Sequence, residues 1–377
     1  MLVFVGVMGL WLASGVRAAD AALFVAYHVT YVIGPGWVVY RLLRPGDTVR
    51  VRQLAVGWAL GYVIEVLTFA ATAAISARWL LSLYPLAFVA LGVGFSARVR
   101  ARPVIAACAG ELPSGWGWVV AGLCLLALAF LAVEFFAGAP LPDQVGRVSY
   151  GIDTVWYLSL AGEALHHWPV GDPTVSGQPL FYHLFATFDC AAITQVTGIG
   201  LPIVFFRLCM VPMVVLAVLG IAVAGAAFGG AWTGPIAVVL ALFVGELNLD
   251  PHVGYKFANE FGDDIVAISP SFLMGAALFA PALALLCELG WRARTPRLSY
   301  GALAAFALLV IGAAGAKAPT APVLAAGLAL YLLWQAMTQG ELDRSLLAAL
   351  GITLATFAFF LLFSRTRKVR ATFFPPR

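Results

Sequence analysis

The residues best suited to chemistry gather in one segment, between residues 140 and 200. The chain has 18 acidic residues and five histidines, and this segment holds five of the acids and three of the histidines. They are Asp143, Asp153, Glu163, Asp172, Asp189, His166, His167 and His183. Carboxylates and imidazoles serve as general bases, metal ligands and proton carriers. We therefore interpret residues 139–200 as the working segment of the protein.

The composition around this segment is that of a membrane protein. Hydrophobic residues make up 62% of the chain and charged residues 11%, with a mean hydropathy of +0.96, whereas soluble domains carry roughly 25% charged residues. The short polar and apolar alternation of a transmembrane barrel is missing. The five cysteines are scattered and predict no disulfide framework or zinc site. The net charge of +4 gives no reason to expect a nucleic-acid partner.

Apolar segments long enough for a hydrocarbon core of about 30 Å recur along the chain and predict about eleven transmembrane helices. The sequence thus predicts an all-α, multi-pass protein of the cell membrane in three parts: residues 1–138, the segment 139–200, and residues 201–377. The expected spans are Leu2–Val16, Ala21–Leu43, Leu54–Ile75, Trp79–Phe95, Trp118–Gly138, Pro202–Phe228, Ala231–Val244, Phe272–Leu289, Tyr300–Ala316, Pro322–Met337 and Leu346–Phe363.

Arginine-rich loops set the orientation, because short cytoplasmic loops carry an excess of Lys and Arg. The loops Arg44–Arg52 and Arg98–Arg102 are separated by two spans and so agree with each other. They place the segment 139–200 and a second loop, 246–270, outside. The basic tail 364–377 then also lies outside, against the bias. Either one late span is miscounted, or these cations hold an anionic lipid headgroup.

Asp153 opens a stretch to Leu165 with helical spacing of its apolar residues, which predicts a helix lying along the membrane interface. At the first turn of that helix Asp153 has two interpretations: a helix cap, or a catalytic or metal-binding carboxylate. Asp143, in the preceding Pro-rich turn, has the same two. His166 and His167 are adjacent and point to different faces, so they do not both bind one metal ion.

Three further sets of residues are candidates for binding or function. Tyr182 and His183 are expected on the outer layer, where the histidine orients a phosphate, moves a proton or simply packs at the interface. Asp263 and Asp264, in the second outer loop with Glu260, either share a divalent cation or are solvated. Among groups within the spans, His28, Glu65 and Glu134 are functional candidates because ionisable groups in hydrocarbon are costly.

One pattern resembles a known class of enzymes. An outer loop follows a span, has an Asp near its start and an interfacial helix, and continues as Ser176-Gly-Gln-Pro-Leu-Phe-Tyr182-His183. This layout resembles the multi-spanning GT-C class of glycosyltransferases, which take a sugar from a polyprenyl-phosphate donor at the outer face. The resemblance implies an acidic residue of this loop as base or metal ligand, with Asp153 matching first and Asp143 second.

The resemblance also implies later outer cations on the donor phosphate, for which Lys317, Arg365 and Arg367 are the matching candidates. Glu163, Tyr182 and His183 complete the expected substrate site, and a divalent cation is the candidate cofactor. Two other functions stay open. A transporter or flippase of a lipid-linked solute would need polar groups near the bilayer midplane, in repeated halves. A non-catalytic subunit of a membrane assembly would need no donor at all.

Overall fold

The computed structural model describes residues 1–99, 112–137, 140–142, 150, 152–175, 177–178, 180, 182–243, 269–290 and 299–373. At residues 95–99, 134, 152, 243 and 363–373 it describes the backbone only. The predictions that fall on Asp143, Glu260, Asp263 and Asp264 lie outside the described residues.

The elements of the described chain are helices. The first half contains α1 (Leu2–Ala13), α2 (Ala18–Tyr27), η1 (His28–Ile33), α3 (Gly34–Leu43), α4 (Arg50–Ala74), η2 (Arg78–Ser82), α5 (Tyr84–Val99), α6 (Trp116–Phe130), η3 (Leu131–Phe136) and α7 (Ile152–His166). The second half contains α8 (Phe185–Thr197), α9 (Leu201–Ile203), η4 (Val204–Leu208), α10 (Met210–Gly229), α11 (Thr233–Phe243), α13 (Pro270–Gly290), α14 (Tyr300–Ala316), α15 (Thr320–Gln339) and α16 (Arg344–Phe373).

Seven helical runs of the described chain are long and apolar enough to cross a membrane. They are Ala18–Leu43, Arg50–Ala74, Trp116–Val133, Leu201–Gly229, Pro270–Gly290, Thr320–Gln339 and Arg344–Leu362. Shorter apolar helices occupy the positions of the other four expected spans: Leu2–Ala13, Tyr84–Gly94, Thr233–Leu242 and Tyr300–Ala316. The chain is therefore a multi-pass helical membrane protein, and the count of eleven spans stays a prediction.

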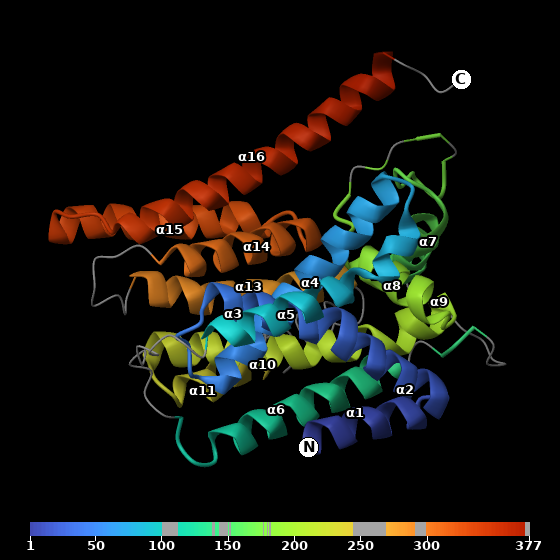
Figure 1. Cartoon of the computed structure of the whole chain (residues 1–377), viewed down its shortest axis with the longest axis horizontal. Coiled ribbons are helices and arrows are strands. Elements are labelled where there is room, and N and C mark those ends of the chain that lie inside the picture. The colour runs from blue at the N-terminus through green and yellow to red at the C-terminus, as the bar shows by residue number, and fades with distance from the viewer. Residues whose placement is uncertain are drawn as a thin grey trace, which may run out of the picture.

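The long helices form a bundle whose two ends differ. In Figure 1, α10, α13 and α14 are stacked beside one another, and α10 packs on α13, which packs on α14. α7, α8 and α9 gather at one end of the bundle, on the right in Figure 1. α16 runs along α15 and then inclines away from it toward that same end. We call the end of the bundle where α7, α8 and α9 gather the α7 end. α7 spans Ile152–His166, close to the helix predicted between Asp153 and Leu165.

Proline shapes the run from α2 to α3. Pro35 has no N–H to donate to the carbonyl of Tyr31 one turn earlier, and the helix widens into the π-helical turn η1 at this point. The carbonyl of Tyr31 is instead bonded by the hydroxyl of Tyr84, from the start of α5. The polar backbone group freed by the proline is thus satisfied by a neighbouring helix, as a hydrocarbon environment requires.

Glycines let α3 and α4 approach closely. A Cβ atom at Gly61 would overlap the backbone carbonyl of Val32, and one at Gly36 would overlap the backbone of Gly57 and Gly61. Gly57 and Gly61 are four residues apart and so lie on one face of α4. Small residues at this spacing are typical of tightly packed membrane helices, because the attraction there comes from close van der Waals contact.

The end opposite α7 is held by ion pairs. Asp47, in the loop between α3 and α4, accepts hydrogen bonds from Arg52, with 2.7 Å between Nε and Oδ2. Glu288, near the end of α13, pairs with Arg52 and, at 2.7 Å, with Arg44. The loop at Arg44 and the end of α13, which were both predicted to face the cytoplasm, therefore meet at one end of the bundle.

The glycine contact predicts the result of a small substitution. We expect Gly61→Ala to lower the stability by about 1–3 kcal/mol, because the added methyl group forces α4 away from the backbone of η1. The apparent melting temperature of the detergent-purified protein, followed with a thiol-reactive dye at the four described buried cysteines, measures this.

Gly122→Ala, in α6, is the matched control, because a Cβ at Gly122 meets no atom within 4 Å. Equal melting temperatures for Gly61→Ala and Gly122→Ala would contradict the close approach of α3 and α4.

Candidate functional site

A chain of hydrogen bonds joins four segments at the α7 end. The hydroxyl of Tyr157, on α7, lies 2.7 Å from Oγ of Ser271 in the first turn of α13. It also lies 2.8 Å from the hydroxyl of Tyr182, which precedes α8. Tyr157 and Ser271 are both buried. Tyr157 and Ser271 are 114 residues apart in the sequence, so their positions in the chain alone would not assign them to one site.

The chain of hydrogen bonds continues from Ser271 to a cation, Lys317. Nε2 of His183 lies 3.1 Å from Oγ of Ser271, and Oγ of Ser269 lies 3.1 Å from the same atom. Nζ of Lys317 donates to Oγ of Ser269 at 3.5 Å. No carboxylate among the described side chains pairs with Lys317. We call Tyr157, Tyr182, His183, Ser269, Ser271 and Lys317 the Lys317 cluster.

The local sequence explains why Lys317 reaches the cluster. α14 ends at Ala316, and Lys317 leaves the helix with an extended backbone before α15 begins at Thr320. On the facing helix, a Cβ atom at Gly275 would lie 2.9 Å from Cβ of Lys317. The absence of a side chain at Gly275 therefore lets the lysine stem lie against α13 and aim its ammonium group at Ser269.

Burial and charge set the protonation of the cluster. Burial and the nearby charge of Lys317 lower the pKa of His183 from 6.5 to about 4, so its imidazole is neutral at pH 7. Burial, the hydrogen bond to Tyr157 and the charge of Asp153 raise the pKa of Tyr182. The phenol and the imidazole are both neutral hydrogen-bonding groups at pH 7, and the lysine supplies the positive charge.

An apolar cavity of about 450 Å³ opens beside the cluster. Tyr182 and His183 lie on its wall with Trp168, and the rest of the lining is hydrocarbon. The apolar lining comes from α4, α8, α14, α16 and the segment before α8, including Leu67, Ala70, Leu180, Phe185, Ile311, Phe357 and Phe360. The site therefore combines a hydrophobic compartment with a rim of hydrogen-bonding groups, as ligand pockets commonly do.

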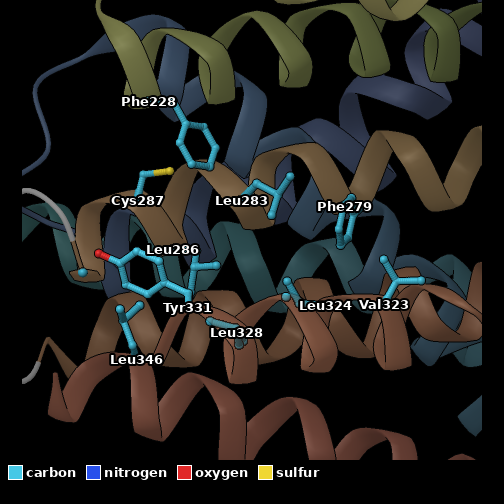
Figure 2. Close-up of a pocket in the computed structure, with 12 residues that line it drawn as sticks. Phe228, Phe279, Leu283, Leu286, Cys287, Val323, Leu324, Leu328, Tyr331 and Leu346 are labelled. Carbon is cyan, nitrogen blue, oxygen red and sulfur yellow. The ribbon is translucent and has the colours of Figure 1, made fainter. Parts of the chain in front are cut away.

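A second cavity differs in chemistry. Its volume is about 260 Å³, and it lies between α10, α13, α15 and α16. Figure 2 shows aliphatic and aromatic side chains around it, and the Tyr331 hydroxyl supplies the oxygen among the labelled side chains. A third cavity, of about 420 Å³, lies among the first helices and contains His28. The cavity of about 450 Å³ is the better candidate for an anionic ligand, because two of its lining residues, Tyr182 and His183, belong to the Lys317 cluster, although Lys317 itself does not line it.

The structure brings together only some of the residues expected at the site. Lys317, Tyr182 and His183 meet in the Lys317 cluster. Asp153 is exposed on the first turn of α7. Glu163 lies farther along α7, where Oε2 is 2.9 Å from Nδ1 of His167. Arg365 and Arg367 are on α16, and their side chains are outside the description.

Three residues of the site were not singled out from the sequence: Tyr157, Ser269 and Ser271. The Ser269-Pro270-Ser271 sequence at the start of an apolar span was a usable signal, since hydroxyl groups there lie at a helix N-terminus. The partners of Tyr157 come from segments far apart in the chain and gave no local signal. The described residues contain no group of three metal-ligating side chains, and the expected cation ligands Asp263 and Asp264 lie outside them.

Comparison with known proteins gives no relative: no protein-family model, no curated protein and no solved structure matches this chain significantly.

The depressed pKa of His183 predicts how stability depends on pH. As pH falls below 6.5, the unfolded chain takes up a proton at this residue before the folded protein does, so stability is lost between about pH 6.5 and pH 4. We expect the melting temperature to fall more between pH 7 and pH 5 in the wild type than in His183→Gln, which cannot titrate.

Other histidines titrate in both proteins, so only the difference between the two curves reports on His183. Parallel curves over this pH range would contradict a neutral His183 at the buried rim of the cavity.

Proposed function

We propose that the protein binds a polyprenyl-phosphate-linked sugar at the α7 end and transfers the sugar to an acceptor. The observation that carries the proposal is that Tyr182 and His183 line an apolar cavity and that hydrogen bonds connect His183, through Ser271 and Ser269, to the ammonium group of Lys317. A lipid phosphate has the same two parts, a long hydrocarbon chain and an anionic head. Such a ligand also reaches its site from within the membrane.

The cavity suits an isoprenoid chain. Its aromatic residues, among them Phe185, Phe188 and Phe360, offer wide apolar surfaces without polar atoms to desolvate. Phe359 of α16 lines the cavity and is also 61% exposed, so the cavity reaches the surface of the bundle beside an apolar helix. On this proposal the isoprenoid chain enters the cavity there, where it meets no polar group of α16.

The cluster suits the phosphate. Lys317 supplies a positive charge, and the Ser269 and Ser271 hydroxyls supply hydrogen-bond donors. Both serines flank Pro270, the first residue of the 21-residue helix α13, whose N-terminal dipole favours an anion. In sugar transfer the lipid phosphate is the leaving group, so groups that stabilise its developing negative charge lower the barrier.

Asp153 is the candidate base for the acceptor hydroxyl. It is exposed, so an acceptor arriving from solution can reach it, and its charge acts on Tyr182 at the edge of the cluster. General-base catalysis of this kind contributes about 100- to 10,000-fold to a rate. On this proposal the bound head lies between the carboxylate of Asp153 and the ammonium group of Lys317.

Transport of a lipid-linked solute is the second candidate, and it is favoured by buried acids inside the bundle. Glu65 on α4 and Asp189 on α8 are 0% and 1% exposed. Ionisable groups at such depth mark proton or solute pathways in many transporters. A transporter would move the lipid across the bilayer without consuming it, which separates this candidate from sugar transfer.

The proposal predicts that Lys317→Gln weakens binding of undecaprenyl phosphate by about 10- to 100-fold, because one charge-assisted hydrogen bond of about 1.5–3 kcal/mol is lost. Binding of undecaprenol, which lacks the phosphate, should not change. Native mass spectrometry of the purified protein with each lipid measures both. Asp153→Asn should bind undecaprenyl phosphate as the wild type does and lose turnover of its sugar-linked forms.

Two controls make this outcome specific. Arg344→Gln removes an exposed cation at the start of α16 and should leave both lipids unaffected. Asp172→Asn removes a half-buried carboxylate from the same segment as Asp153, whose hydrogen bonds come from Thr174, and should keep turnover. The same affinity for the phosphate in Lys317→Gln and wild type, or full turnover in Asp153→Asn, would contradict the assigned roles.

A further inference from the structure

Two carboxyl groups face each other in the interior of the bundle. Glu65 is in α4, nine residues before its end at Ala74, which places it about 14 Å from that end of the helix. Asp189 is in the second turn of α8, which packs on α4. The two carboxyl groups are within hydrogen-bonding range of each other. Both residues are almost fully buried, with exposures of 0% and 1%.

The pair lacks the partners that buried carboxylates require. The Tyr27 hydroxyl donates to Oε1 of Glu65. Oε2 of Glu65, both oxygens of Asp189 and the hydroxyl of buried Tyr62 have no hydrogen-bond partner among the described atoms. Neither acid belongs to an ion pair of the described residues. Two adjacent carboxylates without a cation would combine desolvation with like-charge repulsion.

The groups around the pair do not supply a positive charge. The titratable groups that act on it are phenols and thiols, which are neutral at pH 7: Tyr27 from α2, Tyr62 from α4, Tyr84 from α5, Cys190 from α8 and Cys209 just before α10. His28, on η1, stacks its ring edge against Tyr62 and accepts a hydrogen bond from Trp58.

The guanidinium group of Arg78 is engaged by other partners. Arg78, on η2, donates to the carbonyls of Leu165 and His167 and lies 5.7 Å from the ring centre of Phe69. It therefore joins η2 to the end of α7. The contacts made by Arg78 leave the acids of α4 and α8 without a basic partner among the described side chains.

We propose that Glu65 and Asp189 form a proton-binding site, in which one shared proton lies between the two carboxyl groups. The neutral carboxyl group donates to the ionised one, so the repulsion between two charges is replaced by a charge-assisted hydrogen bond. The shared proton gives an unpartnered oxygen of each residue a partner.

The proton site and the Lys317 cluster are close to each other in the sequence, at the start of α8. α8 begins at Phe185, two residues after His183, and Asp189 is one turn further on. Phe185 and His183 both line the cavity of about 450 Å³. The shared proton fastens α8 to α4, and its loss places two like charges between these helices. Protonation of the pair therefore fixes the position of the cavity wall, whichever ligand the cavity binds.

Infrared spectroscopy of the full-length protein in lipid nanodiscs tests the proposal directly. A protonated carboxyl group in an apolar site gives a carbonyl band separate from those of carboxylates and amides. We expect this band in the wild type at pH 7 and its loss, by one carboxylic acid per chain, in the isosteric double variant Glu65→Gln/Asp189→Asn. Glu341→Gln, which changes an exposed acid before α16, should keep the band.

Two results would overturn the proposal. One is the absence of the band in wild-type protein at pH 7, which needs no variant and so does not depend on how a variant folds. The other is evidence that the pair binds sodium. In that case the melting temperature of the wild type would rise when N-methylglucamine chloride is replaced by sodium chloride, and that of the double variant would not. A melting temperature that is indifferent to this exchange, together with the band, supports the shared proton.

Discussion

Hydrocarbon cannot hydrogen-bond, and this constraint organises the structure. Every polar group buried in the bundle must find its partner within the protein. The freed carbonyl of Tyr31 is bonded by Tyr84. The indole of Trp11 donates to the carbonyl of Arg207 at 2.9 Å, across a sequence separation of 196 residues. At one end of the bundle, Asp47, Glu288 and two arginines satisfy one another. Buried polar clusters whose members do not all find partners within the protein are therefore the best candidates for binding a ligand.

Among the described residues, two groups that combine several polar side chains are open in this sense. In the Lys317 cluster, an ammonium group, an imidazole and four hydroxyl-bearing residues connect to a cavity without an acidic partner in the described structure. In the pair of Glu65 and Asp189, three of the four carboxyl oxygens have no hydrogen-bond donor among the described atoms. The first group needs an anion, and the second needs a proton or a cation. Asp189 is on α8, and Tyr182 and His183 lie in the segment just before it, so this short helix connects the two sites along the polypeptide.

The class of fold could be predicted from the sequence, because the apolar runs are long and separated by charged loops. The runs around Arg50–Ala74 and Pro270–Gly290 were predicted within a few residues. The span predicted as Trp118–Gly138 also agrees within two residues with the helical run from Trp116 to Phe136, but the π-helical turn η3 at its end was not predicted. Hydropathy reports the mean character of a segment, whereas a π-helical turn depends on local backbone geometry.

Less of the site could be predicted. The polar segment before α8 and the isolated Lys317 were recognisable because polar residues are rare in this chain. Tyr157 was not, because an aromatic residue on an interfacial helix is typical of membrane anchoring. Asp189 was seen only as one acid of a polar segment, and Glu65 as a lone acid within a span. Their pairing depends on the packing of α8 against α4, which no periodicity in the sequence encodes.

The central claim is that the cavity beside Lys317 holds the hydrocarbon chain of a lipid phosphate. Photo-crosslinking in nanodiscs, with an undecaprenyl phosphate analogue that carries a diazirine on its first isoprene units, tests it most directly. The account predicts adducts in the peptides that contain Trp168 to Phe188 and Phe357 to Leu361, which unlabelled undecaprenyl phosphate competes away and undecaprenol competes away less well. Adducts confined to the Tyr331 cavity of Figure 2, or no adduct that the phosphate displaces, would contradict it.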